Sequence, residues 1–127
     1  MKALQAIAVS IVLLGTAHAQ TAPQKMVGTW IGKTSNCCDS VIIIKSVEPG
    51  GGATGTYECK NRSQGLLPFG PQLIQGKQAG GKFDGKKFSI ETTFGLYIRV
   101  AVEGENKMTG EMADGPGLRT PVTFVKQ

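Results

Sequence analysis

Three cysteines offer the most specific chemistry in the chain. Cys37 and Cys38 are adjacent, and Cys59 follows about twenty residues later. Three thiols with Asp39 beside them would suit a soft metal ion or a redox reaction. The alternative is one structural disulfide between Cys59 and either Cys37 or Cys38, because a bridge between the adjacent pair requires a strained ring. The spacing leaves the choice between those two partners open, with one thiol left over.

The N-terminal residues 1–19 have the layout of a secretory signal peptide. Residues 1–2 give a short positive start, residues 3–15 are mostly apolar, and residues 17–19 (Ala-His-Ala) form a small-x-small cleavage site. Cleavage there leaves one domain, residues 20–127, and lowers the net charge from +5 to +4 because one lysine is removed. We expect an exported protein, periplasmic or secreted. We do not expect it to span a membrane, because the apolar run is short and no second one follows.

Export has two consequences for the chemistry of the mature chain. An oxidising compartment favours the structural disulfide over the metal or redox site, and closing a loop of about twenty residues contributes roughly 3 kcal/mol. Cleavage also removes His18, the only histidine. The mature chain then lacks the usual general base at neutral pH and the commonest metal ligand.

The remaining residues match no catalytic or cofactor motif. The chain has no nucleophile elbow, phosphate loop or zinc helix signature. The carboxylate pairs Glu103/Glu105 and Glu111/Asp114 lie in or near predicted turns, where solvated surface charge explains them. Catalysis by carboxylates alone is the alternative that stays open. The sequence therefore predicts a non-enzymatic protein without a cofactor or a metal site.

The elements that must position these residues are short β-strands separated by turns. After Gln20 no stretch shows helical periodicity, and apolar and polar residues alternate clearly in Leu96–Glu103. Asp84-Gly85 is the clearest hairpin turn. The predicted strands lie near Met26–Lys33, Ser40–Glu48, Ala53–Cys59, Gln72–Lys77, Gly81–Phe83, Lys87–Thr92, Leu96–Glu103, Lys107–Ala113 and Arg119–Lys126.

Together these strands predict an all-β fold. We expect Gln72–Lys77 and Gly81–Phe83 to form one irregular strand, which gives about eight strands in all. One apolar face on each strand fits an antiparallel sandwich or barrel, and we expect an up-and-down β-barrel. The run Val41–Ile44 breaks the alternation, so this strand is either covered on both faces or carries an exposed apolar patch.

Short segments of the chain resemble known small barrels. Residues 28–30 (Gly-Thr-Trp) and 54–57 (Thr-Gly-Thr-Tyr) are similar to the Gly-x-Trp opening of lipocalins and to the first three strands of avidins, which are calycin-type barrels. Residues 108–111 and 121–124 resemble small exported bacterial lipocalin-like domains. The resemblance implies a lipocalin-like barrel and indicates little about function.

The resemblance also implies roles for two aromatic residues. As in lipocalins, Trp30 is expected in the structural core at the closed end of the barrel, beneath a cation from the last strand, Arg119 or Lys126. In avidins a tyrosine in the position of Tyr57 helps to hold biotin. Biotin binding is not expected here, because Gly32 replaces a polar residue of avidins and no second tryptophan is present.

An apolar segment, Gly65–Pro71, contains two prolines and suggests a lid, a contact patch or a satellite core. An eight-stranded barrel either fills its interior or holds one small ligand. We therefore expect a small, mostly apolar ligand in or at the barrel mouth. The candidate ligand-binding residues are Tyr57, Leu67, Phe69 and Tyr97.

Six basic residues between positions 60 and 90 predict a basic face. They are Lys60, Arg62, Lys77, Lys82, Lys86 and Lys87, and Asp84 is the only acid among them. Such a face suits an acidic protein, an anionic lipid surface or an envelope polysaccharide, or it is simply solvated. Nucleic acid is not expected, because the stretch lacks aromatic residues on which bases would stack.

These observations leave three classes of function. The first hypothesis is an exported non-enzymatic barrel that carries a small apolar ligand. The alternative is a protein–protein interaction module, such as a periplasmic inhibitor of an envelope-directed hydrolase, which would use the basic face or Gly65–Pro71. A structural envelope protein without a pocket is the third. The left-over thiol leaves both a monomer and a dimer open.

Overall fold

The computed structural model describes residues 22–34, 39–60, 65–114 and 119–127. The predicted leader, Cys37, Cys38 and Arg62 lie outside these ranges. The described residues form one short helix and nine strands. They are α2 (Ala22–Met26), β1 (Gly28–Thr34), β2 (Asp39–Val47), β3 (Gly52–Cys59), β4 (Leu67–Gly70), β5 (Ala79–Phe83), β6 (Lys87–Glu91), β7 (Leu96–Glu103), β8 (Lys107–Asp114) and β9 (Arg119–Lys126).

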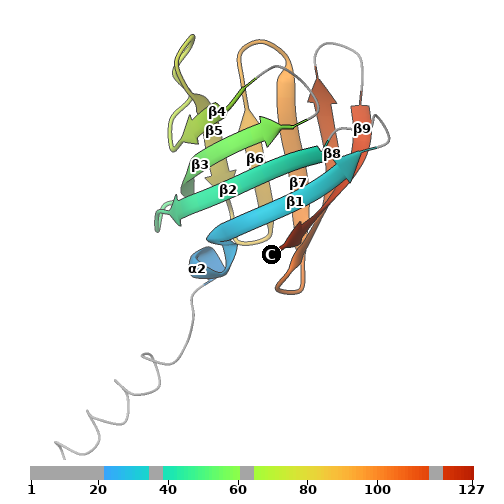
Figure 1. Ribbon diagram of the computed structural model, residues 1–127. Coiled ribbons are helices and arrows are strands. Elements are labelled where there is room, and N and C mark those ends of the chain that lie inside the picture. Colours follow the sequence, from blue (N-terminus) through green and yellow to red (C-terminus); the bar gives the residue numbers. More distant parts are fainter. Residues whose placement is uncertain (1–21, 35–38, 61–64, 115–118) are drawn as a thin grey trace, which may run out of the picture.

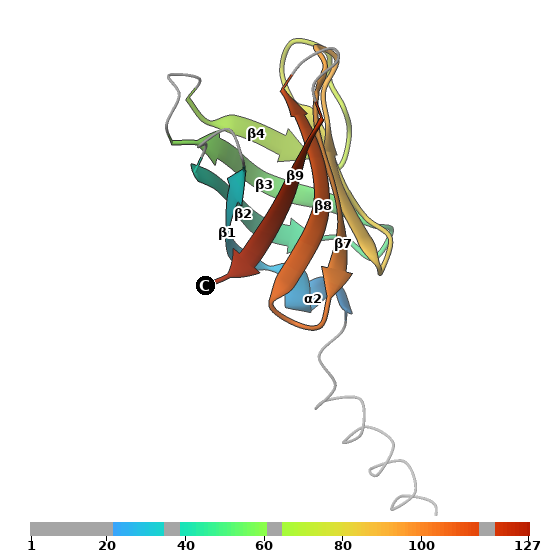
Figure 2. The ribbon, with the colours of Figure 1, turned by 90° about the vertical axis from the view of Figure 1, so that its right-hand side faces the viewer.

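The strands close into one barrel in sequence order, with β1 paired to β9 (Figure 1 and Figure 2). All sequential pairs are antiparallel except β4 and β5, which lie parallel to each other. The predicted all-β barrel is therefore confirmed. Within the described residues, no helix is long and apolar enough to cross a membrane.

The strands β4 and β5 together take the place of one barrel strand. Both pair antiparallel with β3: Leu67 lies opposite Tyr57 in the first pairing, and Gly81 lies opposite Ala53 in the second. Between them, residues 71–78 leave the sheet and return, so that Phe69 lies beside Ala79. The barrel thus has eight strand positions built from nine segments, close to the predicted count.

The prediction was wrong about which residues occupy this position. Gln72–Lys77 is a loop that contains only the single bridge Ile74↔Gln78, whereas the predicted loop Gly65–Pro71 contains β4. The error has a physical source, because proline within an apolar run normally argues against a strand. Pro68 is accommodated here with its side chain exposed, while Phe69 enters the core.

The other predicted strands agree with the structure to within two residues at each end. Leu96–Glu103 and Arg119–Lys126 match at both ends. The turn at Asp84 also forms as predicted. The Asp84 carboxylate accepts hydrogen bonds from the backbone N–H groups of Lys86 (2.9 Å) and Lys87 (2.7 Å), and Gly85 adopts a φ of 100°.

Alternate residues of every strand point into the barrel and fill it. On β7, for example, Ile98 is fully buried whereas its neighbour Arg99 is exposed. Phe69 and Phe88 meet edge to face, with ring centroids 5.9 Å apart. The large apolar side chains that are at most 1 % exposed are Trp30, Ile42, Ile44, Phe69, Phe88, Ile90, Ile98, Met108 and Phe124.

The helix α2 covers the lower end of the barrel in Figure 1 and Figure 2. Met26 is 2 % exposed, and its carbonyl oxygen accepts a 2.9 Å hydrogen bond from the indole N–H of Trp30. The ammonium group of Lys126 donates to the carbonyl oxygen of Lys25 at 2.7 Å and lies 5.8 Å from the centre of the Trp30 ring. Trp30 is thus core at this closed end, under Lys126.

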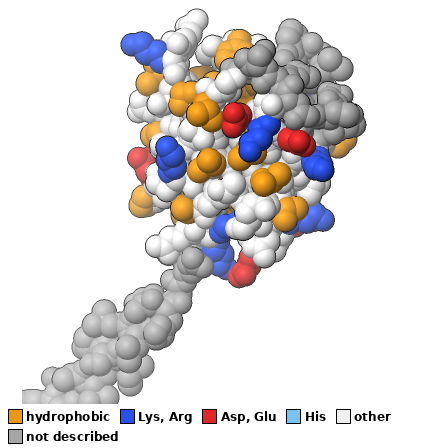
Figure 3. Space-filling view, in the orientation of Figure 1, with side chains coloured by type: hydrophobic (Ala, Val, Ile, Leu, Met, Phe, Trp, Pro, Cys, Tyr) orange, Lys and Arg blue, Asp and Glu red, His pale blue; other side chains and the backbone are white. Residues whose placement is uncertain are grey.

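The run Val41–Ile44 has one covered face and one exposed face. Ile42 and Ile44 point into the core, whereas Ile43 is 37 % exposed. Ile31 lies between Val41 and Val125 in the register, and all three point outward. Figure 3 views the face formed by β1, β2 and β3, where hydrophobic side chains lie between charged ones. Of the two alternatives for this run, the exposed apolar patch is the observed one.

Candidate functional site

A small apolar hollow lies at the end of the barrel opposite α2. It is formed where the loop 71–78 approaches the turn 92–95 between β6 and β7, and both lie at the top of Figure 1. We call it the rim hollow; its volume is about 190 Å³. Its principal lining residues are Leu67, Leu73, Ile74, Ala79, Thr92 and Phe94.

The apolar residues of the rim hollow are unusually open to solvent. Phe94 is 62 % exposed, Leu73 is 47 % exposed and Ile74 is 43 % exposed. Leu66, next to the lining residue Leu67, is also 62 % exposed. Large apolar side chains that gather at one place on a surface mark a binding site more often than single scattered ones do.

Local geometry explains why these side chains stay outside the core. Leu73 packs over the outer face of β5, where a Cβ on Gly80 would lie 3.2 Å from the Cβ of Leu73. Phe94 sits in a turn that ends at Gly95, whose φ of 98° suits glycine. The Thr92 hydroxyl closes this turn by donating to the carbonyl oxygen of Leu96 at 2.6 Å.

Three of the four predicted ligand-binding residues point into the barrel. Leu67 lies opposite Tyr57 in the register and is partly buried against the core, and Phe69 follows two residues later. Tyr57 is 2 % exposed and Phe69 is 1 % exposed. Leu67 is therefore the member of this set that lines the rim hollow.

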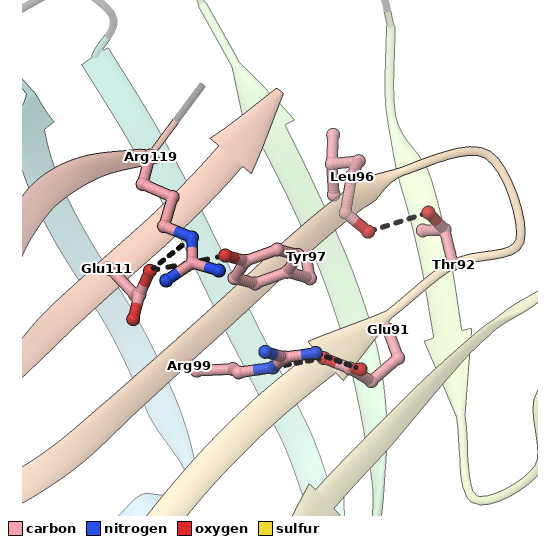
Figure 4. A network of polar contacts seen from close by, with 7 residues as sticks. All are labelled: Glu91, Thr92, Leu96, Tyr97, Arg99, Glu111 and Arg119. Carbon is pink, nitrogen blue, oxygen red and sulfur yellow. Dashed lines mark hydrogen bonds and ion pairs between the residues drawn. The ribbon is translucent and has the colours of Figure 1, made fainter. Parts of the chain in front are cut away.

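The fourth predicted residue, Tyr97, lies on the outer face of β7, away from the other three. Its hydroxyl donates to Glu111 at 3.2 Å, and the guanidinium of Arg99 stacks 4.0 Å from its ring centre. Arg99 also makes two hydrogen bonds, of 3.0 Å and 3.1 Å, with Glu91, which raise the pKa of Arg99. Figure 4 shows these contacts, together with the 3.7 Å ion pair between Arg119 and Glu111.

The upper interior contains several small or polar residues. The hydroxyls of Ser40 and Tyr57 lie 3.2 Å apart, and both residues are buried. Cys59 is 2 % exposed and lies opposite Ser40 in the register. Cys38 precedes Ser40 by two positions in the chain and lies outside the described residues.

Filling of the interior also accounts for Gly32. A Cβ at this position would lie 2.6 Å from the Phe124 ring, so the space that a polar side chain would need is taken by an aromatic core residue. The part of the interior beside β1 and β9 is therefore occupied by protein side chains. A ligand therefore has more room at the rim than in this part of the interior.

The predicted basic face divides into two groups. Lys82, Lys86 and Lys87 lie together at the hairpin of β5 and β6, whereas Lys60 follows β3 and Lys77 lies in the loop 71–78. Arg62 falls outside the described residues. The lysines at positions 82, 86 and 87 thus belong to one hairpin, whereas the other two described lysines of this set do not.

The sequence-based site does not include the three most exposed apolar residues of the rim hollow, Leu73, Ile74 and Phe94. The sequence predicts a strand at Leu73 and Ile74 and gives no role to Phe94. The sequence does contain a signal for Phe94. A large aromatic residue next to the glycine of a turn lies outside any strand, so its side chain is expected at the surface and available for contacts. The approach of Phe94 to the loop 71–78 had no signal in the sequence.

Comparison of the chain with protein-family models, with curated proteins and with solved structures gave no match. Within the described ranges, no group of three or more His, Cys, Asp or Glu side chains is placed to hold a metal ion. The candidate site therefore rests on the geometry of the rim hollow alone.

Proposed function

We propose that this chain is an exported, non-enzymatic β-barrel that binds a small apolar ligand at its rim hollow. The observation that carries the proposal is the contrast between the packed interior and the exposed rim. Phe69 and Phe88 fill the barrel, whereas Phe94, Leu73 and Ile74 expose between 43 % and 62 % of their surface around the hollow. Covering these side chains with a ligand removes apolar surface from water, which is favourable.

The size of the hollow limits the ligand. Its volume of about 190 Å³ is similar to that of an engineered apolar cavity of roughly 150 Å³ that binds benzene. One aromatic ring or a short acyl segment therefore suits the site. Leu67, Leu73, Ile74 and Phe94 supply the apolar contacts, and Thr92 and Gln78 are the nearby polar groups that would orient the ligand.

The binding test uses 4-fluorobenzyl alcohol as the probe and follows the broadening of its ¹⁹F resonance. We expect saturable broadening with the unmodified protein and its loss in the double variant Ile74→Ser/Phe94→Ser. Val125→Ser is the matched control, because Val125 is also 47 % exposed but lies on β9, outside the hollow. Absence of broadening with the unmodified protein, or equal loss in the control, would contradict the proposal.

Export and a disulfide from Cys59 to Cys37 or Cys38 belong to the same proposal. The register supports the disulfide, because Cys59 is buried opposite Ser40 and both candidate partners precede Ser40 by at most three positions. Native mass spectrometry of protein exported by a living host measures cleavage after Ala19, thiol oxidation and any retained compound together. An uncleaved chain or three free thiols would contradict this part of the proposal.

A further inference from the structure

A second concave site lies on the outer face of the barrel and shares no lining residue with the rim hollow. This outer groove crosses β5, β6, β7 and β8 and has a volume of about 610 Å³. Outward residues lie in two neighbouring rows of the register. One row is Lys82, Ser89, Arg99 and Glu111, and the other is Lys87, Ala101 and Thr109.

The groove forms because short side chains lie beside long ones in these two rows. Ser89, Ala101 and Thr109 are short and form its floor, whereas the long chains of Lys82 and Lys87 stand at one end. Neighbouring strands are about 4.8 Å apart, so the row from β5 to β8 is about 14 Å long. The groove is therefore long enough for an extended ligand rather than a single ion.

The carboxylates near the groove already accept hydrogen bonds from other groups of the protein. Glu91 accepts two hydrogen bonds from Arg99, and Glu111 accepts one from the Tyr97 hydroxyl. Asp84 accepts hydrogen bonds from the backbone N–H groups of Lys87 and Lys86, which lower its pKa. These acids are therefore engaged at their own positions.

The two lysines at the end of the groove are not engaged in the same way. Within the described part of the chain, neither Lys82 nor Lys87 has an ion-pair partner, and both are exposed. Lys82 on β5 lies opposite Ser89 on β6, and Lys87 lies two residues before Ser89 on the same face. The two lysines are therefore diagonal neighbours, and their ammonium groups can reach one anionic group together. Lys86 in the adjoining turn adds a third positive charge.

The groove floor also offers hydroxyl groups. Thr109 Oγ1 is a buried side-chain oxygen with no hydrogen-bond partner, and Ser89 lies on the strand before Arg99 in the same groove. A buried hydroxyl without a partner is uncommon in folded proteins. A ligand with hydroxyl groups in the groove would supply that partner.

We propose that the outer groove binds a segment of an acidic polysaccharide, with one of its carboxylates between Lys82 and Lys87 and its hydroxyls over Ser89 and Thr109. The far end of the groove argues for sparse rather than dense negative charge. Glu111 lies there on β8, and Glu91 lies two residues beyond Ser89 on β6, so a second anion one residue further along the ligand would meet a carboxylate. A polyphosphate or nucleic acid carries such an anion at every repeat, whereas a sugar chain brings mainly hydroxyls.

A trisaccharide with one terminal glucuronate and two neutral glucose residues is the probe, and ¹H–¹⁵N NMR titration reports both affinity and position. We expect saturable shifts at the amides of Lys82, Ser89 and Thr109. The double variant Lys82→Gln/Lys87→Gln should weaken binding by at least about tenfold, since two charge-assisted hydrogen bonds are lost. Binding should also weaken as ionic strength rises.

The matched control is Lys33→Gln/Lys45→Gln, which removes the same charge from exposed positions on β1 and β2. Equal weakening in both double variants would show a net-charge effect and overturn the proposal. Maltotriose of the same length that binds equally well would also overturn it, as would tighter binding of triglutamate, which would indicate an acidic protein partner. Shifts confined to residues 73–78 and 92–94 would assign the ligand to the rim instead.

Discussion

The two ends of the barrel differ in the exposure of their apolar side chains, which are buried at one end and open to solvent at the other. At the closed end, Met26 is 2 % exposed and Trp30 is fully buried beneath α2. At the rim, Leu66 and Phe94 are each 62 % exposed. The two ends therefore differ in what covers them: the chain supplies a helix at one end, whereas apolar side chains of the described loops face water at the other.

This difference separates residues that stabilise the fold from residues that are available for binding. Burial of a large side chain contributes a few kcal/mol to folding, and an exposed one contributes little until a partner covers it. Substitutions at the closed end should thus change the free energy of unfolding, whereas substitutions at the rim should change ligand binding. The following variants test this division, from the largest expected effect to the smallest.

Trp30→Ala should lower the free energy of unfolding by roughly 3–5 kcal/mol, because it leaves a cavity beneath α2 and removes the hydrogen bond to the Met26 carbonyl. Urea titration followed by circular dichroism measures the effect. Phe94→Ser is the comparison at the rim and should change stability by no more than about 0.5 kcal/mol. Similar losses from the two variants would mean that the rim is part of the folding core.

Lys126→Met should destabilise the closed end by roughly 1 kcal/mol. The substitution keeps an apolar stem over Trp30 but removes the ammonium that lies 5.8 Å from the ring centre and donates to the Lys25 carbonyl. Urea titration measures the loss, and Lys45→Met on β2 is a control without these contacts. An equal change in the control would show that Lys126 acts only through net charge.

Asp84→Ala should have the smallest effect, because Asp84 is fully exposed and acts only on its own turn. The backbone N–H groups of Lys87 and Lys86 lower the pKa of Asp84 in the folded protein. Its contribution to stability is therefore present at neutral pH and is lost as the pH falls through this lowered pKa, below roughly pH 4.

Thermal unfolding of Asp84→Ala and the unmodified protein, compared at neutral pH and at progressively lower pH, checks this expectation. The unmodified protein should melt at a slightly higher temperature at neutral pH, and the difference should shrink in acid. A difference that grows as the pH falls would contradict the role given to the carboxylate.

Features that depend on neighbouring residues were predictable from the sequence. Leu96–Glu103 was predicted with its observed ends, because apolar and polar residues alternate over the whole strand. The Asp84-Gly85 turn was predictable because its hydrogen bonds join residues at most three positions apart. The segment 65–78 was misassigned, since Pro68 is a poor strand signal and β4 is stabilised by pairing with β3 across the barrel.

The candidate site was less predictable than the fold. Leu67 was identified because it belongs to an apolar run in the sequence. Tyr97 was also selected from its residue type, yet it points to the outer face, where it contacts Arg99 and Glu111. Successive residues of a strand point to opposite faces of the sheet. The alternation within Leu96–Glu103 therefore already predicted that Tyr97 lies on the other face from Leu96 and Ile98.

The sequence by itself determined the all-β class, most strand boundaries and the faces of the longer strands, because these follow from a two-residue period and from local turn chemistry. The tertiary structure decided that β1 closes onto β9 and that residues 71–78 leave the sheet between β4 and β5. It also brought Leu73 to Phe94 and Lys82 to Thr109. These arrangements depend on contacts between residues about ten or more positions apart, which no local pattern in a single sequence records.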